Sequence, residues 1–206
     1  MTIRFHKHDL PDLSLYDVES VAIDTETLGL NPHRDRLCLV QLSNGDGSAD
    51  LVQIAKGQTS APNLEALLAN PKITKLFHFA RFDMGILFKT FGVMTTPVYC
   101  TKIASRLTRT YTDRHGLKDI TRDLLTGVDL NKAAQSSDWA AEDLSDAQLA
   151  YAASDVLYLH QLKEALDFRL SREERTAFAQ ACYDFLPTRV HLDLAGWPDD
   201  DIFAHS

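Results

Sequence analysis

The sequence predicts an α/β protein in which helices flank a mixed β-sheet. Apolar, β-branched runs typical of strands lie within residues 21–79, whereas apolar residues recur with a helical period from about residue 80 onward. One short helical segment interrupts the strands, which is typical of a mixed sheet. The chain has 206 residues and an ordinary apolar fraction of 45%, so we expect a single domain over residues 1–206.

Four strands are expected in the first part of the chain, at residues 21–26, 37–43, 49–54 and 73–79. A strong hairpin signal, NGDG at 44–47, lies between the second strand and the third. The first three strands should therefore form a meander. A helix at 63–69, capped by Asn63 after Pro62, is expected before the fourth strand.

The rest of the chain is predicted to be mostly helical. Besides a short strand at 98–100, the expected elements are helices at 81–91, 101–109, 115–125, 144–170 and 171–185. Gly92 should end the first of these, and Ser145 with Gln148 three residues later forms a capping pattern for the long one. The last helix is expected to stop before Pro187, which leaves residues 187–206 as a C-terminal tail.

Charge and cysteine usage narrow the function classes. The formal net charge of −8 is opposite to that of proteins that coat long nucleic acid, so any nucleic-acid contact should be small and local. The three cysteines are widely spaced without a CxxC, which argues against a disulfide framework or a zinc site and suits a reducing cytosol. No run approaches the ~18 apolar residues of a membrane span, and the N-terminus lacks the order of a secretory signal. We expect a cytoplasmic protein with no membrane partner.

Two acids end the first predicted strand, in the run VAIDTE. Successive side chains of a strand alternate faces, so Asp24 and Glu26 should point the same way, about 7 Å apart along the chain. Like charges at that distance raise each other's pKa unless something positive lies between them. The pair is either a solvated strand end or a site for a hard cation, for which oxygen ligands are required.

Two further acidic positions stand out. Asp83 falls in the first turn of a helix directly after a strand, where the macrodipole alone favours an acid. Tyr151 and Asp155 are four residues apart and so share one face of the long helix. Taken alone, that pair is equally well explained by a tyrosine–aspartate hydrogen bond in the core.

Together these residues resemble the DEDDy 3′-5′ exonucleases of the ribonuclease D-like family, within the ribonuclease H-like fold. The resemblance extends from about residue 18 to 170 and includes the segment KAAQSSDWAAEDLSDAQLAYAASDVLYL. The chain departs from the ribonuclease D pattern at Glu142-Asp143-Leu144, where Arg-Pro-Leu is usual, and at its end, where helical nucleic-acid-binding domains are expected. The length and the segments TETLGLNPHRDRL, CTKIASRLTRTYTDRHGLK and GWPDDDIFAHS are similar to the single-domain nano-RNase C branch of that family.

The resemblance implies a reaction and a set of roles. Two Mg²⁺ ions, for which Mn²⁺ should substitute, would be held about 4 Å apart and stabilise both oxygens of an in-line phosphoryl displacement. The implied ligands are Asp24, which bridges the ions, Glu26, Asp83 and Asp155. Tyr151 would orient the attacking water, because an unperturbed tyrosine, with a pKa of about 10, is a poor base at neutral pH. The product would be a 5′-mononucleotide released from a 3′ end.

The same resemblance implies the substrate contacts. Leu30 would act as an apolar wedge between the two terminal bases, although Leu30 and Leu28 are also compatible with core positions. His78 and Arg81 would touch the scissile or adjacent phosphate, and Thr25 would join them as a substrate contact. His78 is equally compatible with a histidine whose hydrogen bonds are satisfied within the strand.

One basic region, 102–118, contains five cations against the single acid Asp113: Lys102, Arg106, Arg109, Arg114 and Lys118. It is compatible with a solvated face, a single-strand contact or a subunit interface complementary to the acidic run 199–201. Members of the nano-RNase C branch assemble as ring-shaped octamers. We therefore expect a homo-octamer in which Trp197, Ile202 and Phe203 of the tail dock on a neighbouring protomer.

Three functions are compatible with these motifs. The preferred one is a metal-dependent exoribonuclease that hydrolyses very short RNA, especially dinucleotides. The second is a general 3′-5′ exonuclease on longer RNA or on DNA, since no motif reads the 2′-hydroxyl. The third is a non-catalytic RNA-binding module, which would be expected to have lost one or more of the acids.

Overall fold

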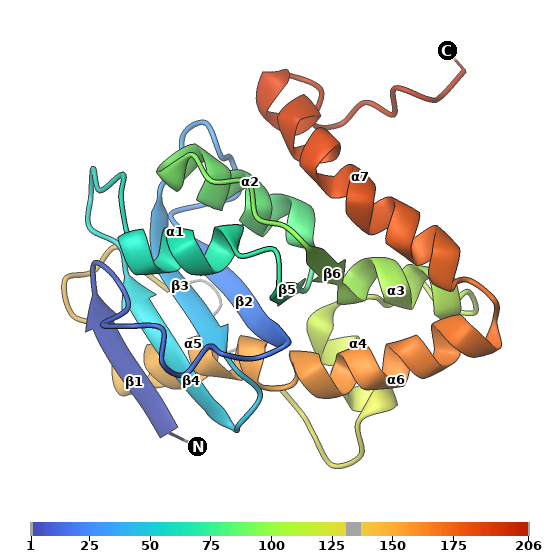
Figure 1. Ribbon diagram of the computed structural model, residues 1–206, viewed down its shortest axis with the longest axis horizontal. Helices are drawn as coiled ribbons and strands as arrows, with labels where there is room; N and C mark the ends of the chain where they lie inside the picture. The colour runs from blue at the N-terminus through green and yellow to red at the C-terminus, as the bar shows by residue number, and fades with distance from the viewer. Residues whose placement is uncertain (1, 131–136, 206) are drawn as a thin grey trace.

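A six-stranded mixed sheet forms the centre of the computed structural model, which describes residues 2–130 and 137–205 (Figure 1). The strands are β1 (Thr2–Lys7), β2 (Ser20–Thr27), β3 (Leu37–Ser43), β4 (Ser48–Gln53), β5 (Thr74–Phe77) and β6 (Val98–Cys100). Their order across the sheet is β1-β4-β3-β2-β5-β6. The β2–β3 and β3–β4 pairs are antiparallel and the other pairs are parallel, so the predicted mixed sheet is confirmed.

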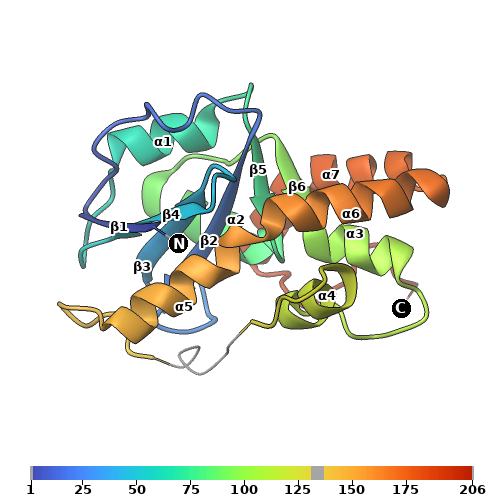
Figure 2. The ribbon, with the colours of Figure 1, turned by 90° about the horizontal axis from the view of Figure 1, so that it is seen from below.

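Seven helices are found among the described residues: α1 (Pro62–Ala69), α2 (Ala80–Phe91), α3 (Thr101–Thr108), α4 (Leu117–Leu124), α5 (Asp146–Leu157), α6 (Leu159–Arg172) and α7 (Thr176–Ala195). Helices α1 and α5 lie on opposite faces of the sheet, and α3, α6 and α7 pack together beside it (Figure 2). Every residue of the central strand β3 is buried. Within residues 2–130 and 137–205 no helix is both long and apolar enough to cross a membrane.

The predicted hairpin joins β3 to β4. Gly45 and Gly47 have φ angles of 90° and 84°, a left-handed backbone that glycine adopts without strain. The Ser43 hydroxyl closes the turn by donating to the carbonyl oxygen of Ser48 at 2.7 Å. The meander of β2, β3 and β4 is therefore confirmed, and it fixes the register of the strand that carries Asp24 and Glu26.

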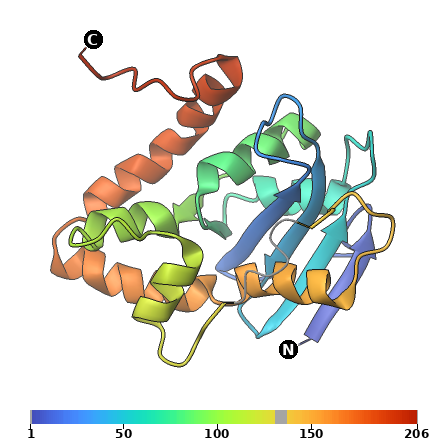
Figure 3. The same cartoon turned by 180° about the vertical axis from the view of Figure 1, so that it is seen from behind.

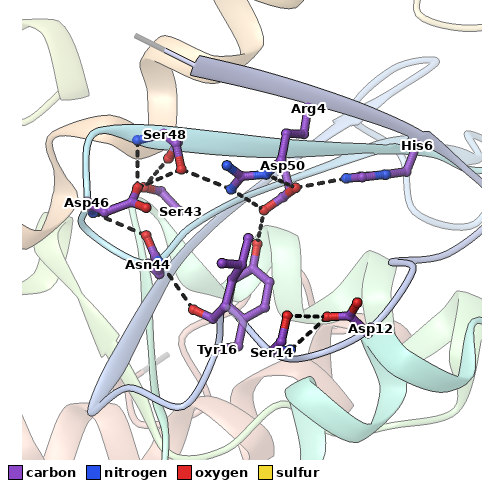
Figure 4. Close-up of polar contacts among 11 residues, drawn as sticks. Arg4, His6, Asp12, Ser14, Tyr16, Ser43, Asn44, Asp46, Ser48 and Asp50 are labelled. Atoms are coloured by element: carbon purple, nitrogen blue, oxygen red, sulfur yellow. Dashed lines mark hydrogen bonds and ion pairs between the residues drawn. The ribbon is translucent and has the colours of Figure 1, made fainter.

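The sequence analysis did not predict strand β1. Its residues, TIRFHK, include two cationic side chains and a histidine, so they do not form an apolar run. A buried carboxylate on β4 explains the pairing (Figure 4). Asp50 accepts hydrogen bonds from Arg4 at 2.7 and 2.8 Å and from the Tyr16 hydroxyl at 2.6 Å, and the His6 Nε2 atom lies 2.8 Å from it. This network attaches β1 to the sheet through charge, which hydrophobic periodicity does not detect.

Three predicted boundaries are wrong. Ala61 caps α1, with Pro62 as its first residue, so Asn63 lies inside the helix. The helix expected at 144–170 is two helices, because Tyr158 ends α5 at φ −108° and ψ −1°. The Ser145 capping box is confirmed.

The third error concerns the last helix, which continues through Pro187 to Ala195. A proline inside a helix costs roughly 3 kcal/mol. Here Leu186 and Val190, on either side of the proline, are both buried, and α7 packs along α2, so tertiary contacts hold the helix together. Only the residues after Ala195 form a non-helical tail of turns and bends, which leads away from the sheet (Figure 3).

Candidate active site

A pocket of about 300 Å³ opens where β2 meets α5 and the start of α2. Its walls include carboxylates, two lysines, a histidine and a tyrosine, and the lining residues are Asp24, Thr25, Glu26, His78, Phe79, Lys102, Gly116, Leu117, Lys118, Leu130, Tyr151 and Asp155. The pocket thus joins side chains that are as much as 131 positions apart in the sequence, from Asp24 to Asp155. It contains four of the five residues expected to be catalytic.

Three of the acids converge. Asp24, Glu26 and Asp155 each offer a carboxylate oxygen, and these oxygens lie within 4.8 Å of one another. The alternation of β2 places the first two on one side. Helix α5 packs across that side of the sheet through its buried residues Ala152, Ala153 and Val156. This packing brings Tyr151 and Asp155 to the end of β2.

Asp83 lies beside this group rather than within it. The side chain is 3% exposed in the first turn of α2, and its Oδ1 atom accepts a hydrogen bond from the Thr25 hydroxyl at 2.6 Å. Thr25 is itself buried, and strand alternation directs it away from Asp24 and Glu26. The structure therefore places Thr25 as a partner of Asp83.

The pKa values of acids in and beside the pocket are strongly perturbed. Burial, followed by the charges of Asp83 and Asp155, raises the pKa of Asp24 well above its ordinary value. Burial and the charge of Asp155 raise the pKa of Glu26 to about 8. Burial likewise raises the pKa of Asp83 to about 7. In the absence of a cation, these acids therefore retain protons near neutral pH.

Tyr151 is held as a neutral phenol. Burial and the neighbouring charge of Asp155 raise the pKa of its hydroxyl above the ordinary value. Its ring lies 6.0 Å from that of Trp139, which is 3% exposed. Trp139 thus packs beside the tyrosine. Lys132 and Gln135, which precede it in the segment KAAQSSDWAAEDLSDAQLAYAASDVLYL, lie outside the described residues.

His78 lines the pocket and has a defined partner. Its Nδ1 atom is 2.9 Å from the hydroxyl oxygen of Thr101, which donates to the carbonyl oxygen of Phe77 at 3.2 Å. The hydroxyl has one proton, so it accepts from His78 Nδ1–H. Thr101 is fully buried, and sequence reasoning missed it.

Arg81 is directed elsewhere. Its guanidinium group donates two hydrogen bonds to Asp193 on α7, at 2.6 and 2.8 Å, and one to the carbonyl oxygen of Pro198 at 2.7 Å. Arg189 also pairs with Asp193, at 2.7 Å. The structure does not bring Arg81 into the acidic pocket, and its predicted phosphate contact stays a prediction.

Some cations of the basic region 102–118 line the pocket, and another is buried in the protein interior. Lys102 and Lys118 line the pocket, and Lys102 Nζ lies 4.1 Å from the centroid of the Phe79 ring. Phe79 itself has a left-handed φ of 71°, which turns the chain from β5 into α2. Arg109, by contrast, is completely buried and paired with Asp123 at 2.5 Å, which is a structural role.

Leu28 and Leu30 are not core residues. Leu30 is 82% exposed and Leu28 is 52% exposed on the loop that follows β2. The alternative that placed both leucines in the core is therefore wrong. Leu30 instead projects from the chain four residues beyond Glu26.

A family model of 3′-5′ exonucleases matches residues 12–171, a span that contains the three clustered acids, Asp83 and Tyr151. The chain therefore belongs to this 3′-5′ exonuclease family. The fold of Escherichia coli RNase D agrees: it is 24% identical, has a TM-score of 0.74, and the match covers 90% of this chain and 49% of that one.

Within the family, the chain is similar over its whole length to Brucella melitensis NrnC. The NrnC structure with bound Mg²⁺ is 65% identical with a TM-score of 0.96, and the structure bound to pGG is 66% identical with a TM-score of 0.97; both matches cover 100% of each chain. These findings confirm the resemblance to the nano-RNase C branch and the ribonuclease H-like exonuclease fold.

Curated relatives are longer. Ribonuclease D of Acidiphilium cryptum is 39% identical over 155 residues, which are 75% of this chain and 39% of the relative. Ribonuclease D of Jannaschia sp. is 36% identical over 160 residues, 41% of its length. The chain thus spans about two-fifths of the curated relatives that it matches.

Proposed function

We propose that this protein is a metal-dependent 3′-5′ exoribonuclease that hydrolyses very short RNA, dinucleotides above all, to 5′-mononucleotides. The convergence of Asp24, Glu26 and Asp155 within 4.8 Å, with Tyr151 beside them, carries the proposal. NrnC, similar to this chain from end to end, has been solved both with Mg²⁺ and with pGG.

The donor set fits a hard dication. All the converging donors are carboxylate oxygens. Burial first, and repulsion between the acids second, raise the pKa values of Asp24 and Glu26, and a bound cation would offset both effects. We propose that Asp24, Glu26, Asp83 and Asp155 hold two Mg²⁺ ions and that Mn²⁺ can replace them. When bound, such ions lower the pKa of a coordinated water and stabilise charge on the attacking and leaving oxygens.

The remaining side chains bind and orient. Tyr151, a neutral phenol buttressed by Trp139, positions the attacking water by hydrogen bonding. His78, held by Thr101, contacts the substrate backbone, and Lys102 and Lys118 place positive charge in the pocket wall. Leu30 separates the terminal bases. A contact from Arg81 to a phosphate requires that it leave Asp193.

The test is a length series of 5′-labelled RNAs from two to about twenty nucleotides, with DNA counterparts, in Mg²⁺, Mn²⁺ or chelator. We expect fastest turnover of the two-mer and none with chelator or in Asp155→Asn. Asp143→Asn, which neutralises an exposed acid before α5, is the matched control and should act like wild type. Equal rates at all lengths would instead indicate a general exonuclease, and binding without cleavage an RNA-binding module.

We also propose that the protein forms a homo-oligomer, an octamer by family resemblance, in which the tail docks on a neighbouring protomer. The exposed fractions of Trp197, Ile202 and Phe203, 47%, 47% and 77%, support this, because large apolar side chains at a chain end favour burial. Free thiols at all three cysteines support a cytosolic location.

A further inference from the structure

The loop between β2 and β3, residues 28–36, inverts the usual distribution of polarity. Leu30 near its tip is 82% exposed, whereas the charged Asp35 is only 7% exposed. The loop lies beside α2 (Figure 1), where Lys89 donates to the carbonyl oxygen of Pro32. The contacts of Asp35 explain why a charged residue is buried in the same loop that exposes a leucine.

Asp35 closes the loop through its contacts with Asn31. Its Oδ2 atom accepts a hydrogen bond from the Asn31 N–H at 3.0 Å, and its own N–H donates to the Asn31 carbonyl oxygen at 2.7 Å. The Arg34 guanidinium adds a bidentate pair at 2.7 and 2.8 Å. The guanidinium and the Asn31 N–H hold the pKa of Asp35 below its usual range, so the carboxylate is charged at neutral pH.

The same carboxylate packs against the residue on the other side of Leu30. A Cβ atom built on Gly29 would lie 2.4 Å from Asp35 Oδ2, a distance that real side chains do not reach. The Gly29 carbonyl oxygen in turn accepts a hydrogen bond from the Thr27 hydroxyl at 2.6 Å. Both chain neighbours of Leu30 are therefore fixed, one by hydrogen bonding to Asp35 and one by close contact with it.

We propose that Asp35 is a positioning residue that holds Leu30 in its projecting conformation and thereby sets the preference for the shortest substrates. The inference rests on the proposed function. A loop fixed before binding avoids the ordering entropy that a mobile wedge would lose on contact with the bases. A two-mer has few other contacts, so it depends on this saving more than a longer RNA does. The effect should therefore appear in KM for the two-mer, with kcat little changed.

The experiment compares kcat and KM for a two-mer and a six-mer in Leu30→Ala, Asp35→Ala, Asp35→Asn and the double variant Leu30→Ala/Asp35→Ala. We expect Leu30→Ala and Asp35→Ala each to raise KM for the two-mer about tenfold and to lower the two-mer to six-mer ratio of kcat/KM. Asp35→Asn keeps an acceptor for the Asn31 N–H and should be intermediate. Arg34→Ala is the control: it removes the exposed partner but leaves the contacts with Gly29 and Asn31, so it should stay near wild type.

Two further readouts separate positioning from general stability. The double variant should be no worse than Leu30→Ala, because a misplaced wedge and a missing wedge are the same loss. Amides at residues 29–31 should exchange faster with solvent in Asp35→Ala, with exchange in β3 unchanged. An inactive wild type would refute the proposed function. An active wild type in which Leu30→Ala lowers the ratio while Asp35→Ala leaves it unchanged would overturn this inference alone, and additive losses in the double variant would overturn it as well.

Discussion

Replacing Glu26 by glutamine should stabilise the metal-free protein while abolishing its activity. Glu26 is partly buried beside Asp24 and Asp155, and its pKa of about 8 exceeds the ordinary 4.5. The folded state therefore binds a proton more tightly than the unfolded state does. The stabilisation of the folded state by this proton is fully present below pH 4.5 and is lost as the pH rises through about 8.

The size of the effect follows from the two pKa values. The rise from 4.5 to about 8 corresponds to about 5 kcal/mol of unfolding free energy lost above pH 8. At pH 5 only about 1 kcal/mol of this stabilisation has been lost. Glutamine has the shape of the protonated acid and does not ionise. The difference between Glu26→Gln and wild type should therefore grow from about 1 to about 5 kcal/mol across that range, a large share of a typical domain's stability.

The assay is urea unfolding between pH 5 and 9 with chelator, repeated with saturating Mg²⁺. Bound Mg²⁺ should stabilise the wild type at pH 8 and leave Glu26→Gln nearly unchanged, because the variant has lost a ligand. Glu19→Gln, a matched change at an exposed acid just before β2, should follow the wild-type curve. A metal-free wild type with equal stability at pH 5 and pH 8.5, or a Glu26→Gln variant no more stable than Glu19→Gln, would refute the electrostatic reasoning.

Three further predictions follow from the site and the tail. Tyr151→Phe should lower kcat about 100-fold or more with an unchanged unfolding curve, measured on the two-mer; near-normal turnover would exclude water positioning by the hydroxyl. Thr101→Val should raise KM several-fold, because His78 Nδ1–H loses its acceptor, whereas Thr101→Ser should restore it; equal behaviour of the two would assign Thr101 to packing alone. Deleting residues 197–206 should lower the mass seen by light scattering, and an unchanged mass would argue against docking of the tail.

Local spacing predicted which acidic side chains share a face, and the resemblance to the DEDDy exonucleases joined them into one candidate site. Asp24 and Glu26 share a face because a strand alternates, and Tyr151 and Asp155 share one because a helix repeats every 3.6 residues. Neither relation needs knowledge of the rest of the chain. The partners of these residues were not predictable in the same way. The contact from Thr25 to Asp83 depends on how α2 packs beside β2, and the sequence separation of 58 gives no pattern to read.

Two elements were missed or ended too early in the sequence analysis because long-range contacts hold them in place. Strand β1 is attached to the sheet by Asp50, 46 residues from Arg4, so hydrophobic periodicity could not detect it. The continuation of α7 through Pro187 depends on packing against α2, which outweighs a strong local signal. In both cases the decisive energy comes from contacts that form only once the fold exists.

The placement of Arg81 shows why secondary structure has to be assigned before a site is. Arg81 and Asp83 are two residues apart, as are Asp24 and Glu26. In a strand that spacing puts both side chains on one face, but in a helix it turns them about 200° apart. With Asp83 directed toward Thr25, Arg81 must face another neighbour, and α7 supplies Asp193. The same separation along the chain therefore brings Asp24 and Glu26 together in the pocket, but directs Asp83 toward Thr25 and Arg81 toward the C-terminal helix.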